Sequence, residues 1–475
     1  MSTFSGLSTA LSSLNAQRQA LLVSGQNIAN ANTAGYTRQR TDMQAVEAVS
    51  VPSMWSTPMG AGNGVATVGI ARLGDEFLDA RLRTQTSQAS LNTSTATTLS
   101  RLESLVTEPG DTGLASGLQE FWAGWEDVAN SPSSAAARTT LMGKATQLTN
   151  QIADTYTAYE NQWNQARTEA TTYVDQVNST ATSIAELNNQ IRGVIVSGGS
   201  ANELVDRRSV LITQLSGMVG ASSRAQPDGT VNVMVGGNPL VSGDRAQKIQ
   251  LDGSYVMTSA TEGSPPPDPV RLSWSSTGTP LVLDGGTLAG TISSMQPAST
   301  GGPIANAVSK INALATSIAT TVNTVHTGGQ TLAGTTGVDF FSLASGVPAA
   351  LGLSVAFTDP DMVAAGKPLS GEFDGSVADQ ISQLREATDS PDADWRSFVV
   401  ELGVASASAM RRADVSEVSR SVAENLQLSN ASVDVDEEMT NMLNYQRAYE
   451  GAARVLTAID EMLDTLINRT GLVGR

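Results

Sequence analysis

The chain has 475 residues, no cysteine, and a formal net charge of −18 at pH 7. The acidic excess disfavours a nucleic-acid partner, because binding phosphates requires a basic face. The absence of cysteine excludes disulfides and thiolate metal sites. No apolar run reaches 18 residues, so no membrane span is expected, and the N-terminus lacks the basic and apolar regions of a cleavable secretory signal. The length allows about three domains.

The first 36 residues carry apolar side chains at three- and four-residue spacing, which predicts an N-terminal coiled-coil helix over 1–36. These side chains are Phe4, Leu7, Leu11, Leu14, Leu21 and Ile28. Arg18 is the only charge before Arg38, and the rest of the helix surface is Ser, Thr, Asn, Gln and Ala. A helix with so little charge suits close packing against neighbouring copies, so we interpret the apolar set as an assembly seam. Gly25 and the asparagines weaken helix propensity, so the helix should be marginal without partners.

The middle of the chain changes character several times. Prolines and glycines predict an extended connector over 37–74. Strict helical spacing then predicts a helical bundle domain over 75–219, with one long helix at about 141–194 that would reach roughly 80 Å. Alternating valines after the turn Pro227-Asp228-Gly229 predict an inserted β domain over 220–299. The remaining expected segments are a helix returning to the bundle (300–327), a loop and β segment of the outer domain (328–375), and bundle helices (376–430).

Residues 431–475 predict a second terminal coiled-coil helix. Its apolar set is Met439, Met442, Tyr449, Leu456, Ile459, Leu463 and Leu466. The two terminal helices enclose everything else, so the ends of the chain should return to one place. The expected fold class is mainly α with an inserted β domain: a terminal α-helical coiled coil, an elongated helical bundle and a small β-rich outer domain.

No residue pattern predicts catalysis, a cofactor or a metal. His326 is the only histidine, which leaves one candidate base for a triad and excludes zinc sites with two histidines. We interpret it as a polar residue at a helix end. The acids of 389–394 do not match a calcium loop, and those of 434–438 suit the start of a helix, so both are interpreted as caps. Gly60–Gly64 lacks the spacing of a phosphate loop.

The segment 27–38 resembles the N-terminal signature shared by bacterial flagellar rod, hook and hook-associated proteins. The family pattern Asn-x-Ala-Asn-x-x-Thr-x-Gly-Tyr is met at every fixed position, by Asn27, Ala29, Asn30, Thr33, Gly35 and Tyr36. Residues 435–438 and 445–449 are similar to the closing helix of the same family. Residues 62–65, 202–208, 323–326 and 339–341 are most similar to the members that join the hook to the filament. The chain is shorter after Phe341 than longer relatives, so an outermost domain is expected to be reduced or missing.

The resemblance implies a structural, non-enzymatic subunit of the ring at the hook–filament junction. It implies secretion through the flagellar type III export apparatus, with a cytoplasmic chaperone covering the C-terminal apolar set before export. The implied partners are further copies in a helical ring, the hook protein below, and a second junction protein and the flagellin side above, with no nucleic acid and no membrane. Two alternatives stay open: another axial subunit (hook or distal rod), and a secreted hydrolase or adhesin carried on axial-type termini.

Overall fold

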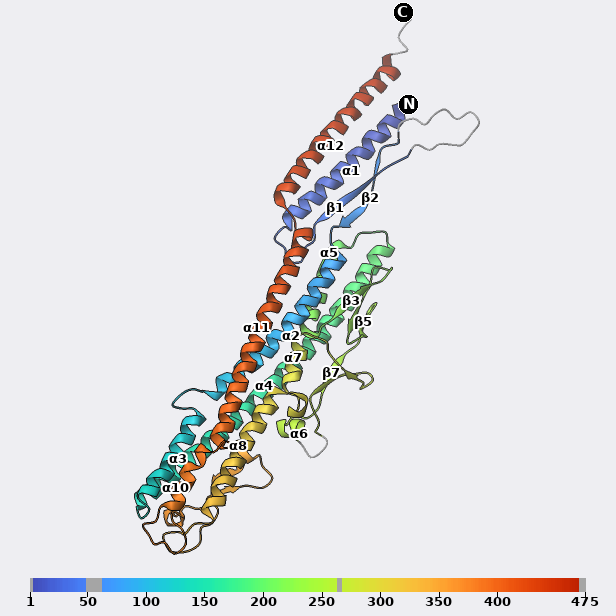
Figure 1. Ribbon diagram of the computed structural model, residues 1–475. Coiled ribbons are helices and arrows are strands. Elements are labelled where there is room, and N and C mark those ends of the chain that lie inside the picture. The colour runs from blue at the N-terminus through green and yellow to red at the C-terminus, as the bar shows by residue number, and fades with distance from the viewer. Residues whose placement is uncertain (1–2, 48–61, 263–266, 470–475) are drawn as a thin grey trace, which may run out of the picture.

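The protein is an elongated molecule in which a short terminal coil stands on a long helical body (Figure 1). The structure is a computed structural model that describes residues 3–47, 62–262 and 267–469. The two ends of the chain lie side by side in the coil, as α1 (Thr3–Ala29) and α12 (Val435–Asp464), which a π-helical turn continues (Thr465–Arg469).

An antiparallel pair, β1 (Gln39–Ala45) and β2 (Val65–Arg72), packs beside α1 and completes the coil. These two strands lie within the stretch expected as an extended connector over 37–74, and its assignment as a separate segment stays a prediction. The buried residues of β1 are Gln39 and Thr41, and the exposed residue between them is also polar. The strand therefore lacks the alternation of apolar and polar residues from which a strand is predicted. The prolines at 52 and 58 and the glycine at 60 lie outside the described residues.

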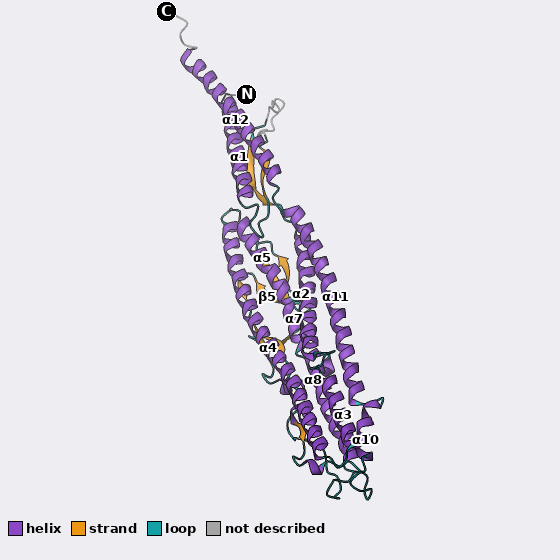
Figure 2. Ribbon diagram, turned by 90° about the vertical axis from the view of Figure 1, so that its left-hand side faces the viewer, coloured by secondary structure: helices purple, strands orange, loops and turns teal. Residues whose placement is uncertain are grey.

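The body is built mainly from helices, most of which run along its length (Figure 2). They are α2 (Glu76–Val106), α3 (Leu114–Asn130), α4 (Ala135–Val196), α5 (Asn202–Val219), α8 (Pro303–His326), α10 (Ser376–Ser382) and α11 (Pro391–Ala431). The predicted long helix is α4, whose 62 residues span about 93 Å. Ser134 caps its start by accepting from the Ala137 amide. Its aromatic residues Tyr156, Tyr159 and Trp163 are fully buried in the core.

Two small antiparallel sheets lie against α4. The first joins β3 (Ser222–Ala225), β4 (Val231–Val235), β5 (Asn238–Ser242) and β6 (Arg245–Ala246), and the second joins β7 (Ile249–Asp252), β8 (Arg271–Trp274) and β9 (Pro280–Leu281). The amide of Asn188 on α4 binds the Val231 carbonyl of β4. The same stretch of chain also forms α6 (Met257–Thr261) and α7 (Thr287–Ser294), and α7 packs on α2 and α4. The predicted fold class, mainly α with an inserted β part, is confirmed.

The remaining elements are short. They are η1 (Ala298–Thr300), β10 (Phe341–Leu343), α9 (Ala349–Gly352), β11 (Leu353–Val355), η2 (Pro360–Met362) and η3 (Gln383–Glu386). Strands β10 and β11 form one antiparallel pair. The assignment of residue ranges to separate domains stays a prediction from the sequence.

His326 ends α8 inside the core, where it is fully buried. Its Nδ1 lies against the Val338 carbonyl, its Nε2 accepts from the Ala364 amide at 2.8 Å, and the rings of Trp125, Phe340 and Phe357 surround it. Burial lowers the pKa of His326 from 6.5 to about 4. It is the last residue of the helix, as expected, and it acts as a neutral link between two backbone segments.

This burial makes stability depend on pH. Below pH ~6.5 the unfolded chain protonates its imidazole, whereas the folded chain does so only near pH ~4. Folded-state stability is therefore complete above pH ~6.5 and falls as the pH drops. We expect the free energy of unfolding, measured with urea, to decrease by about 2 kcal/mol between pH 7 and pH 5. A His326→Gln variant should lose most of this slope, and an unchanged slope would contradict the assignment.

Candidate functional site

Many polar side chains meet at the joint between the coil and the body. After α1 the chain turns back at Asn27–Arg38 into β1, passes from β2 into the body at Arg72–Asp75, and returns to the coil at Ala431–Glu438. The Arg38 amide donates to the Ala431 carbonyl at 2.9 Å, and the Leu73 amide donates to the Arg38 carbonyl at 2.9 Å. Both crossings between coil and body are thus tied to one another by backbone hydrogen bonds.

Asn27 satisfies the backbone where α1 turns back into β1. Its side chain is 1% exposed, and its amide nitrogen donates to the Gln39 carbonyl at 2.8 Å. Its Oδ1 accepts from the Gln39 amide at 3.0 Å and from the Tyr36 hydroxyl at 2.9 Å. The Asn27 side chain therefore supplies both backbone hydrogen bonds that a neighbouring strand would otherwise give to Gln39. Burial first, and then the charge of Asp206, raise the pKa of Tyr36 to about 12, so it stays a hydroxyl donor.

The other motif residues shape the loop between Asn27 and Gln39. Thr33 Oγ1 donates to Asn30 Oδ1 at 3.2 Å, and the side-chain Nδ2 of Asn30 donates to the Gln26 carbonyl at 3.0 Å. Gly35 has φ 78°, and a Cβ there would lie 2.2 Å from a methyl group of Val210 on α5. Both the backbone conformation and the space therefore require glycine. Ala29 is exposed and takes part in none of these contacts.

Charged side chains connect this loop to the body and to α12. Asp206 of α5 accepts from the Thr37 amide at 3.0 Å and pairs with Arg72 Nε at 2.6 Å. Arg38 binds both oxygens of Glu437, at 2.8 and 3.0 Å, and pairs with Glu438 at 2.8 Å. The hydrogen bonds from Arg38 hold the pKa of Glu437 below its usual value. Glu438 is 2% exposed, so Arg38 supplies a cation beside a buried carboxylate.

The structure places the predicted N-terminal seam residues at the rim and on the outside of the coil. Leu7, Leu14, Leu21 and Ile28 are half-buried, and Leu11 is 52% exposed. The side chain of Phe4 lies outside the described residues. The positions of α1 that are buried are mostly small: Ala10, Ala16, Ala20, Val23, Ser24 and Asn27. Sequence reasoning missed this alanine face, because alanines carry little weight in a hydrophobic pattern.

The predicted C-terminal set divides in the same way. Only Ile459 is buried, and a Cβ at Gly6 of α1 would lie 3.1 Å from its Cδ1. Met442, Leu456 and Leu463 are half-buried, whereas Met439, Tyr449 and Leu466 are exposed. Within one chain, α1 and α12 therefore approach closely through small residues and leave larger apolar side chains on the surface. The two predicted sets lie on neighbouring helices, and most of their side chains stay half-buried or exposed.

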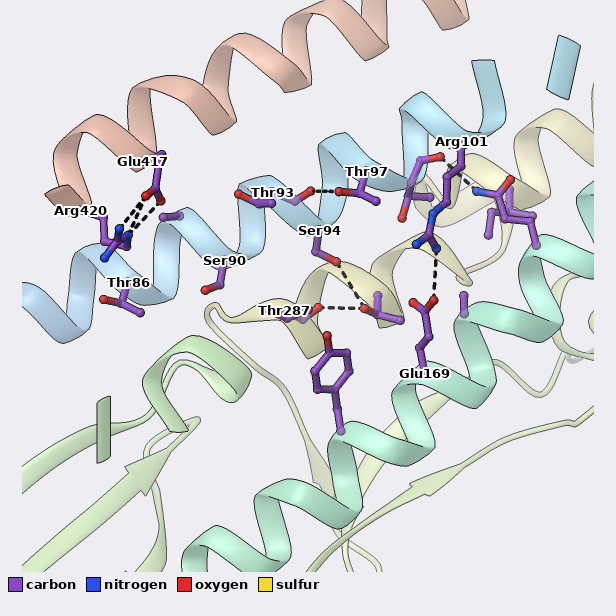
Figure 3. A pocket seen from close by; sticks show the side chains of 17 residues that line it. Thr86, Ser90, Thr93, Ser94, Thr97, Arg101, Glu169, Thr287, Glu417 and Arg420 are labelled. Carbon is purple, nitrogen blue, oxygen red and sulfur yellow. Dashed lines mark hydrogen bonds and ion pairs between the residues drawn. The ribbon is translucent and has the colours of Figure 1, made fainter. Parts of the chain in front are cut away.

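A polar groove of about 510 Å³ lies between α2, α4, α7 and α11 (Figure 3). It is lined mainly by hydroxyl groups, among them Thr86, Ser90, Thr93, Ser94, Thr97 and Thr287. Two ion pairs flank it, Arg101 with Glu169 at 3.2 Å and Arg420 with Glu417 at 2.7 Å. None of its lining residues is a histidine, so these hydroxyls have no imidazole to activate them.

The described residues contain no group of three or more His, Asp or Glu side chains that could hold a metal ion. None of the helices in the described part of the chain is long and apolar enough to cross a membrane. The arrangement at the joint can hold the segments that enter and leave the coil in a fixed geometry. Its polar groups form hydrogen bonds and ion pairs with one another and with the backbone.

Comparison with protein families gives three matches along the chain. Residues 99–341 match the helical domain of the flagellar hook-associated protein FlgK. Residues 7–37 match the flagella basal body rod protein family, and residues 427–469 match the C-terminal region of the flagellar basal body rod FlgEFG proteins. The rod-type matches cover the coil and the joint, and the hook-associated match covers most of the body.

Individual relatives agree with these matches. The chain is 30% identical to flagellar hook-associated protein 1 of Bacillus subtilis over the whole of both chains. It is 30% identical to flagellar hook-associated protein 1 of Escherichia coli over 73% of this chain and 61% of that protein. Its fold resembles that of the flagellar hook junction protein FlgK from Burkholderia pseudomallei, with a TM-score of 0.64 and 16% sequence identity. The match covers 74% of this chain and all of that chain.

With this fold and these matches, the protein is a structural subunit of the bacterial flagellum. It belongs to the class whose N-terminal and C-terminal regions match those of the flagellar rod proteins. Within this class the chain belongs to the flagellar hook-associated protein 1 family. It is a structural subunit of the hook–filament junction, as the sequence resemblance implied. The rival assignment to a hook or distal rod subunit is disfavoured, because the rod-type models match only the two ends.

Removing the Asn27 amide should loosen the joint. In an Asn27→Ala variant the buried amide and carbonyl of Gln39 lose their partners, and we expect the free energy of unfolding to fall by about 2 kcal/mol. Hydrogen exchange at β1 should accelerate. Asn32→Ala is the matched control, because Asn32 is exposed in the same loop, and it should change stability by less than about 0.5 kcal/mol. Equal effects of the two variants would contradict the role given to Asn27.

Removing the Arg38 guanidinium should release the start of α12. Arg38→Gln leaves the buried Glu438 carboxylate without its cation, which should destabilise the docking of α12 by about 2 kcal/mol. Limited proteolysis between α11 and α12 reports this loss. The control is Arg40→Gln, since Arg40 pairs with Asp42 at an exposed site and is expected to contribute almost nothing. Resistance to cleavage that matches the parent protein would count against the proposed link.

Proposed function

We propose that the chain assembles into the junction ring through its two terminal helices, with the apolar side chains that α1 and α12 leave exposed forming the seam between copies. The observation that carries this proposal is the size and number of those side chains. They include Leu11, Leu22, Met439, Leu443, Val455, Met462 and Leu466, each between 50% and 65% exposed. A coil that was complete in one chain would place its largest apolar residues inside.

Burial of this surface supplies a driving force for assembly. Covering one leucine or methionine side chain completely contributes about 1.5–3 kcal/mol. A copy that buries several of them gains enough to order a helix with weak propensity and to offset the entropy lost on docking. In the proposed contact α1 of one copy lies against α12 of the next, and a head-to-tail contact of this kind between unlike surfaces generates rings or helical arrays.

The same features suit export before assembly. Gly6 and Gly25 lie within α1, and its buried face is mostly alanine and serine, so the helix gains little stability from its own chain. A terminal helix of this kind unfolds at low cost, which suits passage through the flagellar type III export apparatus. The exposed methionines and leucines of α12 suit a cytoplasmic chaperone that covers them until export. The neighbours in the assembled flagellum would be the hook protein on one side and the second junction protein and flagellin on the other.

Charge placed on the seam should block assembly without unfolding the monomer. We expect Leu22→Glu and Leu443→Glu to leave the melting temperature of the purified chain nearly unchanged, because both side chains are more than half exposed. In cells that lack the native protein, each variant should reduce its own incorporation at hooks at least tenfold, leaving hooks without filaments and flagellin in the medium. Deletion of residues 1–40 or 435–475 should abolish incorporation.

The matched control is Val347→Glu, which changes an exposed valine in the segment between α8 and α10, away from the coil. It should incorporate as well as the parent. Incorporation of the Leu22→Glu and Leu443→Glu variants at the level of this control, with filaments restored, would overturn the proposed seam.

A further inference from the structure

A second polar cavity, of about 450 Å³, lies between α2, α5 and the first sheet. Its volume is in the range of small-molecule sites. The lining side chains that matter for its chemistry are Arg72, Arg83, Arg208, Ser209, Ser223 and Asp79. This cavity is called the arginine pocket below. It adjoins the joint, because Arg72 pairs with Asp206, the residue that accepts from the Thr37 amide.

Carboxylates neutralise only one of the three arginines that line the pocket. Arg72 pairs with Asp206 at 2.6 Å and with Asp79 at 3.8 Å. Arg83 and Arg208 have no ion-pair partner among the described residues, although both line the same cavity. Two guanidinium groups of the arginine pocket therefore lack a counter-charge.

Arg208 carries its charge in a buried position. It is 6% exposed, and its Nη1 donates to Asn188 Oδ1 and to the Gly229 carbonyl, both at 2.8 Å and both neutral. Its Nε and Nη2 have no hydrogen-bond partner among the described residues and remain accessible to solvent. Burial, followed by the charges of Arg83 and Arg72, lowers the pKa of Arg208 to about 10. The charged form is thus held in an unfavourable environment, which a bound anion would relieve.

Arg83 has hydroxyl groups as its only hydrogen-bond partners. It donates to Ser223 Oγ at 2.7 Å, to Ser209 Oγ at 2.8 Å and to Thr213 Oγ1 at 3.4 Å. Burial lowers the pKa of Arg83 as well. Because Ser209 and Ser223 accept these bonds, each hydroxyl keeps a hydrogen to donate, and no acceptor for it lies among the described residues. The pocket therefore brings unneutralised guanidinium groups and free hydroxyl donors together.

This combination separates the arginine pocket from the other places where an arginine is buried. Arg138 donates to backbone carbonyls and is the only arginine that lines its own cavity. Arg167 donates to a backbone carbonyl and lies 4.0 Å from the centre of the Tyr255 ring. Glu76, the remaining carboxylate of the arginine pocket, is exposed in the first turn of α2, where water and the helix dipole stabilise its charge.

We propose that the arginine pocket binds a small oxyanion, with Arg83 and Arg208 supplying the charge and Ser209 and Ser223 donating hydrogen bonds. Guanidinium groups bind the oxygens of phosphate, sulfate or carboxylate in a fork geometry. A tetrahedral anion offers more acceptor oxygens than a carboxylate, which suits this number of donors, so inorganic phosphate is the expected ligand. It would link α2, α5 and β3 beside the joint. The inference goes beyond the proposed function and does not depend on the seam between copies.

Calorimetric titration of the full chain with inorganic phosphate at pH 7 tests the site. We expect a dissociation constant of about 1 mM or tighter. The melting temperature should rise with phosphate concentration, because a ligand that binds only the folded chain stabilises it. Acetate and chloride at equal ionic strength should bind at least tenfold more weakly. Absence of phosphate binding, or equal binding of acetate or chloride, would overturn the proposal.

A carboxylate placed in the pocket should replace the ligand. Ser223→Asp sets a negative charge beside Arg83, so the variant should melt at a higher temperature without phosphate and bind phosphate at least tenfold more weakly. Arg83→Gln should weaken phosphate binding by a similar factor. The matched control is Ser222→Asp, because Ser222 is exposed and neighbouring strand residues point to opposite faces.

The control variant should bind phosphate as the parent does. Phosphate binding at the parent level by Ser223→Asp would contradict the site even if Arg83→Gln failed to fold. An equal loss of binding in Ser222→Asp would also contradict it, because the effect would then come from added charge alone. None of these changes touches the coil, so they are separate from a failure of the coil seam, which the Leu22→Glu and Leu443→Glu variants report.

Discussion

The buried amide of Asn27 is the constraint on which the arrangement of the chain depends. A helix that reverses into a strand leaves backbone groups without partners, and Asn27 satisfies both groups of Gln39 with one side chain. With β1 fixed in this way, Thr37 and Arg38 are presented to Asp206 of α5 and to Glu437 and Glu438 of α12. Three segments separated by hundreds of residues thereby meet at one place. The coil keeps a defined direction relative to the body because these contacts act together.

Features with a strong local period were predictable from the sequence. The long helix α4 was expected at about 141–194 and runs over Ala135–Val196, since its apolar and aromatic residues repeat without interruption. The inserted strands around Val231–Val235 followed from alternation after a turn. The β1–β2 pair was missed, because its buried residues, Gln39 and Thr41, are polar. The two helices α6 and α7 were missed since each is eight residues or shorter.

The joint was only half predictable. The family motif identified Asn27, Gly35 and Tyr36. The groups that fix the neighbouring Thr37 and Arg38, namely Asp206 with Arg72 and Glu438, come from other parts of the chain, and no spacing rule connects them to the motif. The segment 202–208 had been singled out by resemblance alone, and the structure gives its aspartate a role in holding the Thr37 amide. The packing of α1 on α12 was misjudged for another reason. Helical patterns report which residues are apolar, not which of them are small enough to let two backbones approach, as Gly6 does at Ile459.

Because α4 is long, the angle at the joint strongly affects the position of the far end of the body. A straight helix of 62 residues is a stiff rod of about 93 Å, and the joint lies near one of its ends. A tilt of about 5° at the joint would therefore displace the far end of such a rod by about 8 Å. Small differences in how Arg38, Asp206 and Glu438 are arranged would thus be amplified into a large shift of the distal tip. In a subunit with this geometry, the few hydrogen bonds and ion pairs at the joint determine where the far end of the body lies.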